Sequence, residues 1–126
     1  MEIIKVKGYN TIYALSTFKT DYRKMFNKSE NEYDRHLRKL RFNLNILDEK
    51  HLSVLNGSYP QFEKLTNENL YSIRHITQMN PRVIFAYVSE ENNILLLTCT
   101  LEKSSSDYAS ALAKAKSALK TLGVRI

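Results

Sequence analysis

Residues 82–100 contain two apolar runs around a polar turn: RVIFAYV (82–88), SEENN (89–93) and ILLLTCT (94–100). Short runs rich in β-branched and aromatic residues are typical of buried strands. A third run of this kind, YSIRHI (71–76), precedes them, and Asn80-Pro81 fits the turn between. Both connections are too short for a crossover helix, so the three segments predict an antiparallel meander.

Helical patterns flank this meander. Ser29 and Glu32 form a capping box, and leucines behind them recur at helical spacing, which predicts a helix ending near Leu47. A shorter pattern over residues 16–27 predicts a preceding helix. The last helix is expected between Asp107 and Gly123, because Asp caps a helix start and Gly favours a helix stop.

The alternating residues 3–7 add one short strand at the amino terminus. The predicted order is therefore one strand, two helices, three strands and one helix. This order predicts the α+β class, with a small twisted antiparallel sheet packed by an N-terminal helical pair and a C-terminal helix. A chain of 126 residues with 43% hydrophobic residues and three glycines fits a single domain over residues 1–126.

Composition excludes several classes of protein. The single cysteine, Cys99, cannot form an internal disulfide, and the three histidines lie far apart in sequence, so we expect neither a metal nor a cofactor. The first seven residues lack the apolar core of a signal peptide, and no stretch approaches the roughly 20 apolar residues that span a bilayer. A cytoplasmic protein without membrane association is expected.

The charge balance is basic. Nineteen Lys and Arg against thirteen Asp and Glu give a formal net charge of +6. Basic groups predominate in residues 1–47 and 108–126, and acidic groups in residues 48–107. This distribution favours a polyanionic partner, although an ordinary solvated surface explains the charge alone equally well.

Two arginines stand where the meander turns. Arg74 and Arg82 lie on neighbouring predicted strands, so their side chains could converge, and Lys103 follows the last strand. Converging guanidinium groups suit an anion, because the planar fork of Arg matches phosphate oxygens bidentately. The alternative is that these arginines form ordinary ion pairs with Glu90, Glu91 or Glu102.

Other side chains suit contacts with RNA. Tyrosines can stack on bases, a histidine can carry a proton near neutral pH, and basic side chains on the predicted second helix can follow a phosphate backbone. Each type also has a structural explanation, as a core tyrosine, a half-buried histidine or a solvated helix face. The RNA-binding candidates are His75, Tyr87, Tyr108, Arg38, Lys39 and Arg41.

The region from Phe62 to the last helix resembles the RelE/ParE superfamily of bacterial toxins, and most closely its HigB-like, phage-derived branch. The matching residues are Leu70, Arg74, Arg82, Tyr87 and Lys103. The chain departs from the family pattern at three positions, with Ser72 in place of Glu, Leu101 in place of Phe, and Ser104 in place of a second Lys.

The resemblance implies a toxin of a type II toxin–antitoxin system. Such toxins are metal-independent endoribonucleases that cut messenger RNA, usually on the ribosome, and so arrest translation. Arg74 and Arg82 would then contact the phosphate, and Lys103 would act electrostatically or in proton transfer. The implied partner is a HigA-like antitoxin that contains a helix-turn-helix. The toxin would contact operator DNA only through this antitoxin. A ParE-like inhibitor of DNA gyrase is the alternative function, and a basic binding module is another.

Overall fold

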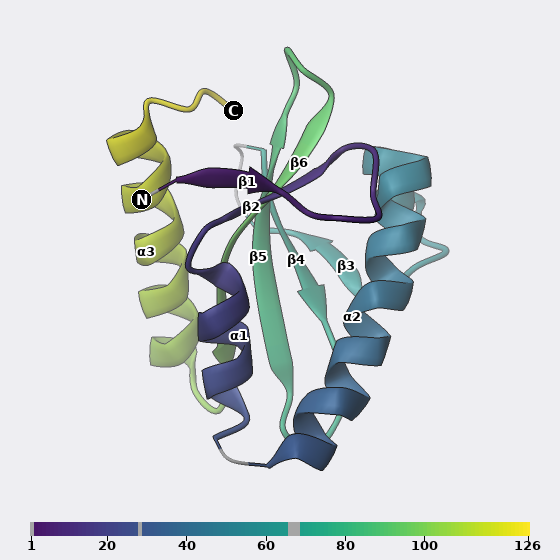
Figure 1. The fold of residues 1–126 in the computed structure, drawn as a ribbon, viewed down its shortest axis with the longest axis vertical. Helices are drawn as coiled ribbons and strands as arrows, with labels where there is room; N and C mark the ends of the chain where they lie inside the picture. The colour runs from purple at the N-terminus through teal and green to yellow at the C-terminus, as the bar shows by residue number, and fades with distance from the viewer. Residues whose placement is uncertain (1, 28, 66–68) are drawn as a thin grey trace.

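The computed structural model describes residues 2–27, 29–65 and 69–126 and shows one six-stranded sheet with helices on both faces (Figure 1). The strands are β1 (Ile3–Lys5), β2 (Ile12–Leu15), β3 (Phe62–Lys64), β4 (Leu70–Arg74), β5 (Pro81–Val88) and β6 (Asn93–Leu101). The helices are α1 (Phe18–Met25), α2 (Glu30–Lys50) and α3 (Ser105–Leu122), and the 3₁₀-helix η1 (His51–Asn56) follows α2.

The sheet is mixed, so the predicted antiparallel sheet was wrong. Its strand order is β1-β2-β6-β5-β4-β3, and β2 pairs parallel with β6 while every other neighbouring pair is antiparallel. The chain starts with the hairpin β1–β2 and not with one strand before a helical pair. A parallel pair needs a long crossover, and the chain from α1 to β5 provides it between β2 and β6.

The predicted meander is present as β4, β5 and β6. Side chains along β5 alternate between two cores, as expected of a strand buried on both faces. Val83 and Phe85 pack on the side of α1 and α2, whereas Ile84 and Ala86 pack against α3. The sheet therefore separates α3 from α2, which lie on opposite sides of it in Figure 1.

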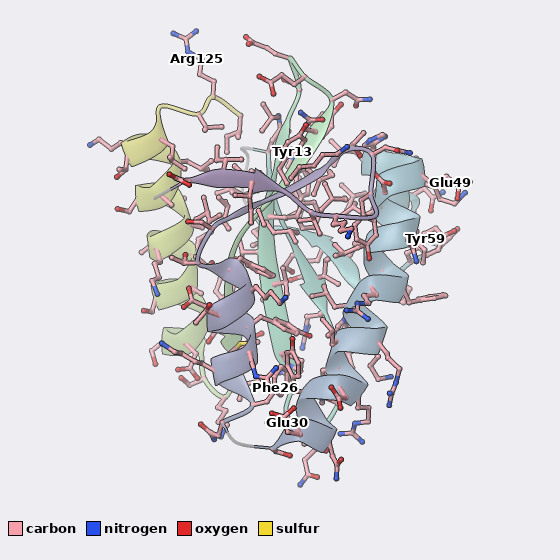
Figure 2. All side chains as sticks on the ribbon, in the orientation of Figure 1. Tyr13, Phe26, Glu30, Glu49, Tyr59 and Arg125 are labelled. Atoms are coloured by element: carbon pink, nitrogen blue, oxygen red, sulfur yellow. The ribbon has the colours of Figure 1, made fainter. Side chains whose placement is uncertain are left out.

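Helix α2 forms where its capping residue and leucine stripe predict it. The Ser29 hydroxyl accepts a hydrogen bond from the Glu32 backbone N–H at 3.4 Å, and Leu40, Leu44 and Leu47 are buried. Phe26 lies between α1 and α2 and closes the core there, with its ring stacked on a histidine of α2 (Figure 2). Within the part of the chain that the structure describes, no helix has the length and apolar character required to span a membrane.

Asp48, near the end of α2, holds the hairpin β1–β2 against the helix. Its carboxylate accepts hydrogen bonds from the backbone N–H groups of Asn10 and Thr11 at 2.9 and 2.7 Å, and from the Thr11 hydroxyl at 2.6 Å. Partial burial alone would raise the pKa of Asp48, but these hydrogen bonds and the nearby His51 hold that pKa below its ordinary value.

Replacing Asp48 with alanine is expected to lower the free energy of unfolding by about 1–3 kcal/mol, because two backbone donors lose their acceptor. The carboxylate stabilises the fold fully above its unfolded-state pKa, and this stabilisation is lost as the pH falls through the lower folded-state pKa. Urea unfolding at pH 7 and pH 3 measures both effects. The control is Glu49→Ala, since Glu49 is exposed and points away from the fold (Figure 2). Equal stability of the two variants would show that Asp48 does not anchor the hairpin.

Candidate functional site

Arg74 and Arg82 lie directly opposite each other on β4 and β5. Directly opposed residues in an antiparallel pair have Cβ atoms about 4.5–5.5 Å apart, and like charges in such positions repel. Alternation along the strands places both side chains on the face that α3 covers, together with Leu70 and Ile84. The register thus places the two arginines directly opposite each other on one face of the sheet, as the convergence expected from sequence requires.

The guanidinium group of Arg82 is held by two carboxylates. Its Nη1 lies 3.1 Å from Glu63 Oε1, and its Nη2 lies 2.8 Å from Glu102 Oε2. The Arg82 guanidinium carbon also lies 4.8 Å from the ring centroid of Tyr108 on α3, which is a cation–π distance. Arg82 is only 5% exposed, so its charge is buried and compensated. Of the pairings considered from sequence, the structure contains the one with Glu102; nothing in the sequence pattern indicated Glu63.

Arg74 differs from Arg82 because it forms no ion pair within the described residues, and it is only partly buried. Its Nε is a buried donor without a hydrogen-bond partner among the described residues, as is the Nε of Arg82. The hydroxyl oxygen of Ser72, on the same face, is also buried and unpartnered there. Buried polar groups are normally hydrogen bonded, so these donors favour a ligand that supplies acceptor oxygens.

We call this cluster the sheet-face patch. It combines two cations, two carboxylates, a hydroxyl and a phenol on one face of the sheet beside the start of α3. The Glu63 side chain is 41% exposed, which leaves one edge of the cluster open to solvent. Its members are Glu63, Ser72, Arg74, Arg82, Glu102 and Tyr108.

Two further residues suggested from sequence lie at different distances from the sheet-face patch. Lys103 is exposed and directly follows Glu102, and its backbone N–H donates to Asp107 at 3.0 Å in the cap of α3. Tyr87 packs against the opposite core, near the other end of β5, and its hydroxyl donates to Asn92 Oδ1 at 2.5 Å. Lys103 therefore borders the patch, and Tyr87 does not belong to it.

His75 is buried behind the sheet, in a polar network with α2. Its Nε2 accepts a hydrogen bond from the Asn43 amide at 3.0 Å, and Asn43 in turn accepts one from Gln61 at 2.9 Å. Burial, together with the neighbouring His36 and Lys39, lowers the pKa of His75 to about 4. A histidine with this pKa is neutral at pH 7 and does not carry protons there.

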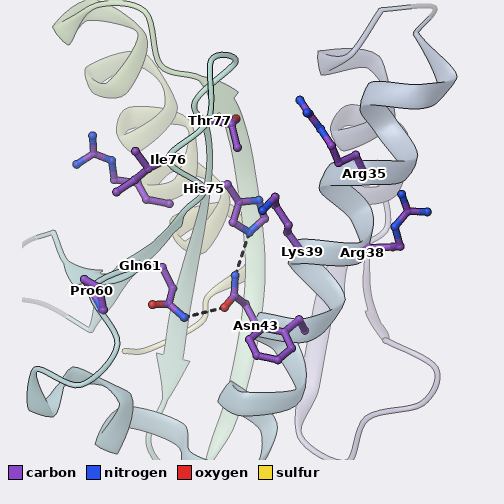
Figure 3. A pocket seen from close by; sticks show the side chains of 11 residues that line it. Arg35, Arg38, Lys39, Asn43, Pro60, Gln61, His75, Ile76 and Thr77 are labelled. Carbon is purple, nitrogen blue, oxygen red and sulfur yellow. Dashed lines mark hydrogen bonds between the residues drawn. The ribbon is translucent and has the colours of Figure 1, made fainter.

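A basic groove of about 590 Å³ opens between α2 and the chain that follows β4 (Figure 3). Figure 3 shows Lys39 extending from the helix toward His75, whereas Arg38 points away from the opening. Arg35 is paired with Glu32 at 2.7 Å. The exposed Arg41 lies on α2 outside the groove lining. We call this cavity the α2 groove; its lining residues are Arg35, Arg38, Lys39, Phe42, Asn43, Pro60, Gln61, Arg74, His75, Ile76 and Thr77.

Arg74 stands at the boundary of both features, because it lines the α2 groove and also belongs to the sheet-face patch. Among the residues that the structure describes, no group of His, Cys, Asp or Glu side chains is arranged to hold a metal ion. The groups that lie near this boundary are the guanidinium groups of Arg74 and Arg82, the carboxylates of Glu63 and Glu102, and the ammonium group of Lys103. Such groups bind phosphate and transfer protons.

No protein-family model matches the chain, and no curated protein matches it.

Proposed function

We propose that this protein is a metal-independent endoribonuclease that cleaves messenger RNA at the sheet-face patch. The observation that carries the proposal is the pair of opposed arginines, of which Arg82 is compensated by glutamates whereas Arg74 has no ion pair among the residues that the structure describes. An uncompensated guanidinium beside a carboxylate provides two groups that RNA cleavage needs: one that binds the phosphate and one that accepts a proton.

In the proposed reaction, the ribose 2′-hydroxyl attacks the adjacent phosphorus. Glu63 takes the hydroxyl proton, since it is partly exposed and is oriented through Oε1 by Arg82. Arg74 binds the non-bridging phosphate oxygens, on which negative charge accumulates. The bond between phosphorus and the 5′-oxygen breaks, and the 5′-oxygen takes a proton from water while Lys103 offsets its charge. The products are a 2′,3′-cyclic phosphate and a 5′-hydroxyl end.

The wider role follows from the resemblance to HigB-like toxins and from the basic charge of the chain. In this role the protein acts in the cytoplasm on messenger RNA held by the ribosome, and its activity arrests translation. A cognate helix-turn-helix antitoxin keeps it inactive between episodes of arrest and carries any contact with operator DNA. A net charge of +6 favours encounter with the polyanionic ribosome–messenger complex.

Cleavage is tested with the purified full chain and end-labelled RNA in EDTA, with and without ribosomes. We expect defined cuts that end in a cyclic phosphate, and no cut where a 2′-deoxynucleotide replaces the attacking one. Growth arrest with intact transcripts would contradict the proposal.

Arg74→Ala is expected to lower the cleavage rate about 100-fold, because one donor to the charged phosphate is lost. The change should leave the free energy of unfolding within about 1 kcal/mol of wild type, as for most surface substitutions. Single-turnover cleavage and urea unfolding measure the two quantities. Lys116→Ala, at an exposed position on α3, is the matched control for removal of one positive charge. An Arg74→Ala protein that cleaves as fast as this control would exclude Arg74 from the site.

Glu63→Gln distinguishes the proton-accepting role of Glu63 from its structural one. The glutamine amide oxygen can still accept the hydrogen bond from Arg82, but it cannot take a proton at neutral pH. We expect folded protein that cleaves at least about 100-fold more slowly, which is typical of the loss of a general base. A folded variant with wild-type cleavage would assign Glu63 only to the ion pair.

A further inference from the structure

The α2 groove has the size and the lining of a small-molecule site. Its volume of about 590 Å³ lies within the usual range for such sites, which combine apolar walls with a few fixed polar groups. Phe42 and Ile76 line it and are 65% and 79% exposed. The ring of Phe42 therefore offers a free surface on which a planar base can stack.

Positive charge borders this apolar surface. The Lys39 side chain extends from α2 toward His75 in Figure 3, which places its ammonium group at the groove. Arg74 also lines the groove, and it belongs to the sheet-face patch as well. A phosphate bound by Arg74 thus has the groove directly beside it, so the nucleotide that carries this phosphate can place its base there.

The polar floor of the groove has one fixed orientation. The neutral His75 accepts a hydrogen bond at Nε2 from the Asn43 amide nitrogen at 3.0 Å. Because the nitrogen of Asn43 faces His75, its oxygen faces Gln61 and accepts a hydrogen bond from the Gln61 amide nitrogen at 2.9 Å. Asn43 is only 5% exposed, and a flipped amide would set like groups against each other on both sides.

This orientation decides which group Gln61 presents to a ligand. Its nitrogen is turned toward Asn43, so its carbonyl oxygen points the other way (Figure 3). Gln61 lines the groove and is partly exposed, and no described residue donates a hydrogen bond to its side-chain oxygen. The floor therefore offers an acceptor. The exocyclic amino groups of adenine and cytosine are donors, whereas the corresponding keto oxygen of a uracil-type base is an acceptor.

We propose that the α2 groove binds the base of a nucleotide next to the cleaved phosphate, and that Gln61 selects adenine or cytosine over uracil. The base stacks on Phe42, its amino group donates to Gln61 Oε1, and its phosphate pairs with Lys39 and Arg74. Asn43 is a positioning residue, because it acts through Gln61. This inference rests on the RNA cleavage proposed above, since it names the base that the cleavage site prefers.

The first experiment measures binding by NMR titration of the purified full chain with cytidine, uridine, adenosine and inosine 5′-monophosphates. Cytidine and uridine, like adenosine and inosine, differ in an amino group that a keto oxygen replaces and in the protonation of the ring nitrogen beside it. We expect the amino member of each pair to bind at least about fivefold more tightly, because the keto member sets an acceptor against the Gln61 oxygen.

Variants assign this preference to the groove. Gln61→Met keeps the length of the side chain without its polar groups and should bind both members of each pair within about twofold of each other. Asn43→Leu frees Gln61 to turn and should also reduce the ratio, which a loss of stability alone does not change. Phe42→Ala should weaken all four nucleotides at least about fivefold. The matched control is Gln78→Met, at an exposed position outside the groove lining, which should keep the wild-type ratios.

The second experiment compares cleavage of RNA substrates that differ in one base beside the cut. We expect wild-type protein to prefer adenine or cytosine, and Gln61→Met to cleave without this preference. Equal binding of the paired nucleotides, no nucleotide binding, or a preference that Gln61→Met retains would overturn the inference, and continued cleavage would leave the nuclease proposal intact. Selective nucleotide binding without cleavage of any RNA would support base recognition of free nucleotides and overturn only the nuclease proposal.

Discussion

Replacing Arg82 with alanine is expected to lower the free energy of unfolding by about 3 kcal/mol, because the change leaves two glutamates without their cation. Glu102 is 21% exposed at its side chain and would lose its partner at 2.8 Å. Glu63 is more exposed and can turn into water, which keeps the expected loss at the lower end of the range for broken buried ion pairs. The cation–π contact with Tyr108 disappears as well.

Arg74→Ala is the matched control for this effect. It removes the same side chain from the directly opposite position, but it breaks no ion pair between described residues and relieves the repulsion between the two arginines. Urea unfolding at pH 7 compares the two variants, and a common slope with denaturant confirms that both unfold in the same way. If Arg82→Ala is no less stable than Arg74→Ala, the ion pairs of Arg82 with the two glutamates do not contribute to the free energy of unfolding as expected.

Stability is expected to fall by about 3 kcal/mol between pH 7 and pH 4 on account of His75. The pKa of this group is about 4 in the folded protein, against an ordinary value of 6.5. Above pH 6.5 neither state is protonated at His75, and the group contributes no pH dependence. As the pH falls below 6.5, His75 binds a proton in the unfolded chain but not in the folded chain. This difference lowers the free energy of unfolding by about 1.4 kcal/mol per pH unit.

His75→Gln should remove this slope, since glutamine does not titrate. Urea unfolding at intervals from pH 7.5 to pH 4.5 measures it, over a range that precedes the protonation of most carboxylates. The matched control is His51→Gln, because His51 is only partly buried and lies outside the network with Asn43. A His75→Gln protein with the wild-type pH profile would contradict the assignment.

The elements that sequence patterns predict well are those whose stability is local. Helix α2 begins at the hydroxyl of Ser29 and buries one leucine stripe, and both features lie within a single segment. The strands of the meander are adjacent in sequence and joined by short turns, so antiparallel pairing follows directly. The opposition of Arg74 and Arg82 follows from that pairing.

The features that sequence patterns missed depend on distant contacts. Strand β2 has four residues, too few to show a period, and its partner β6 lies about 80 positions away in the chain. Strand β3 is shorter still, yet its pairing with β4 brings Glu63 beside Ser72 and within reach of Arg82. An acidic residue directly after Phe62 gives no local sign of this role. The burial of His75 against Asn43 likewise depends on how α2 packs on the sheet.

The parallel pair β2–β6 also determines when the sheet can be assembled during synthesis of the chain. Until the residues of β6 have left the ribosomal exit tunnel, the hairpin β1–β2 has no central strand on which to dock. Glu102 emerges only after β6, so the carboxylates that neutralise Arg82 assemble when most of the polypeptide has already been translated. Nascent chains shorter than about 100 residues therefore lack both the complete six-stranded sheet and the ion pairs of Arg82. The cluster around Arg82 forms only at the end of translation.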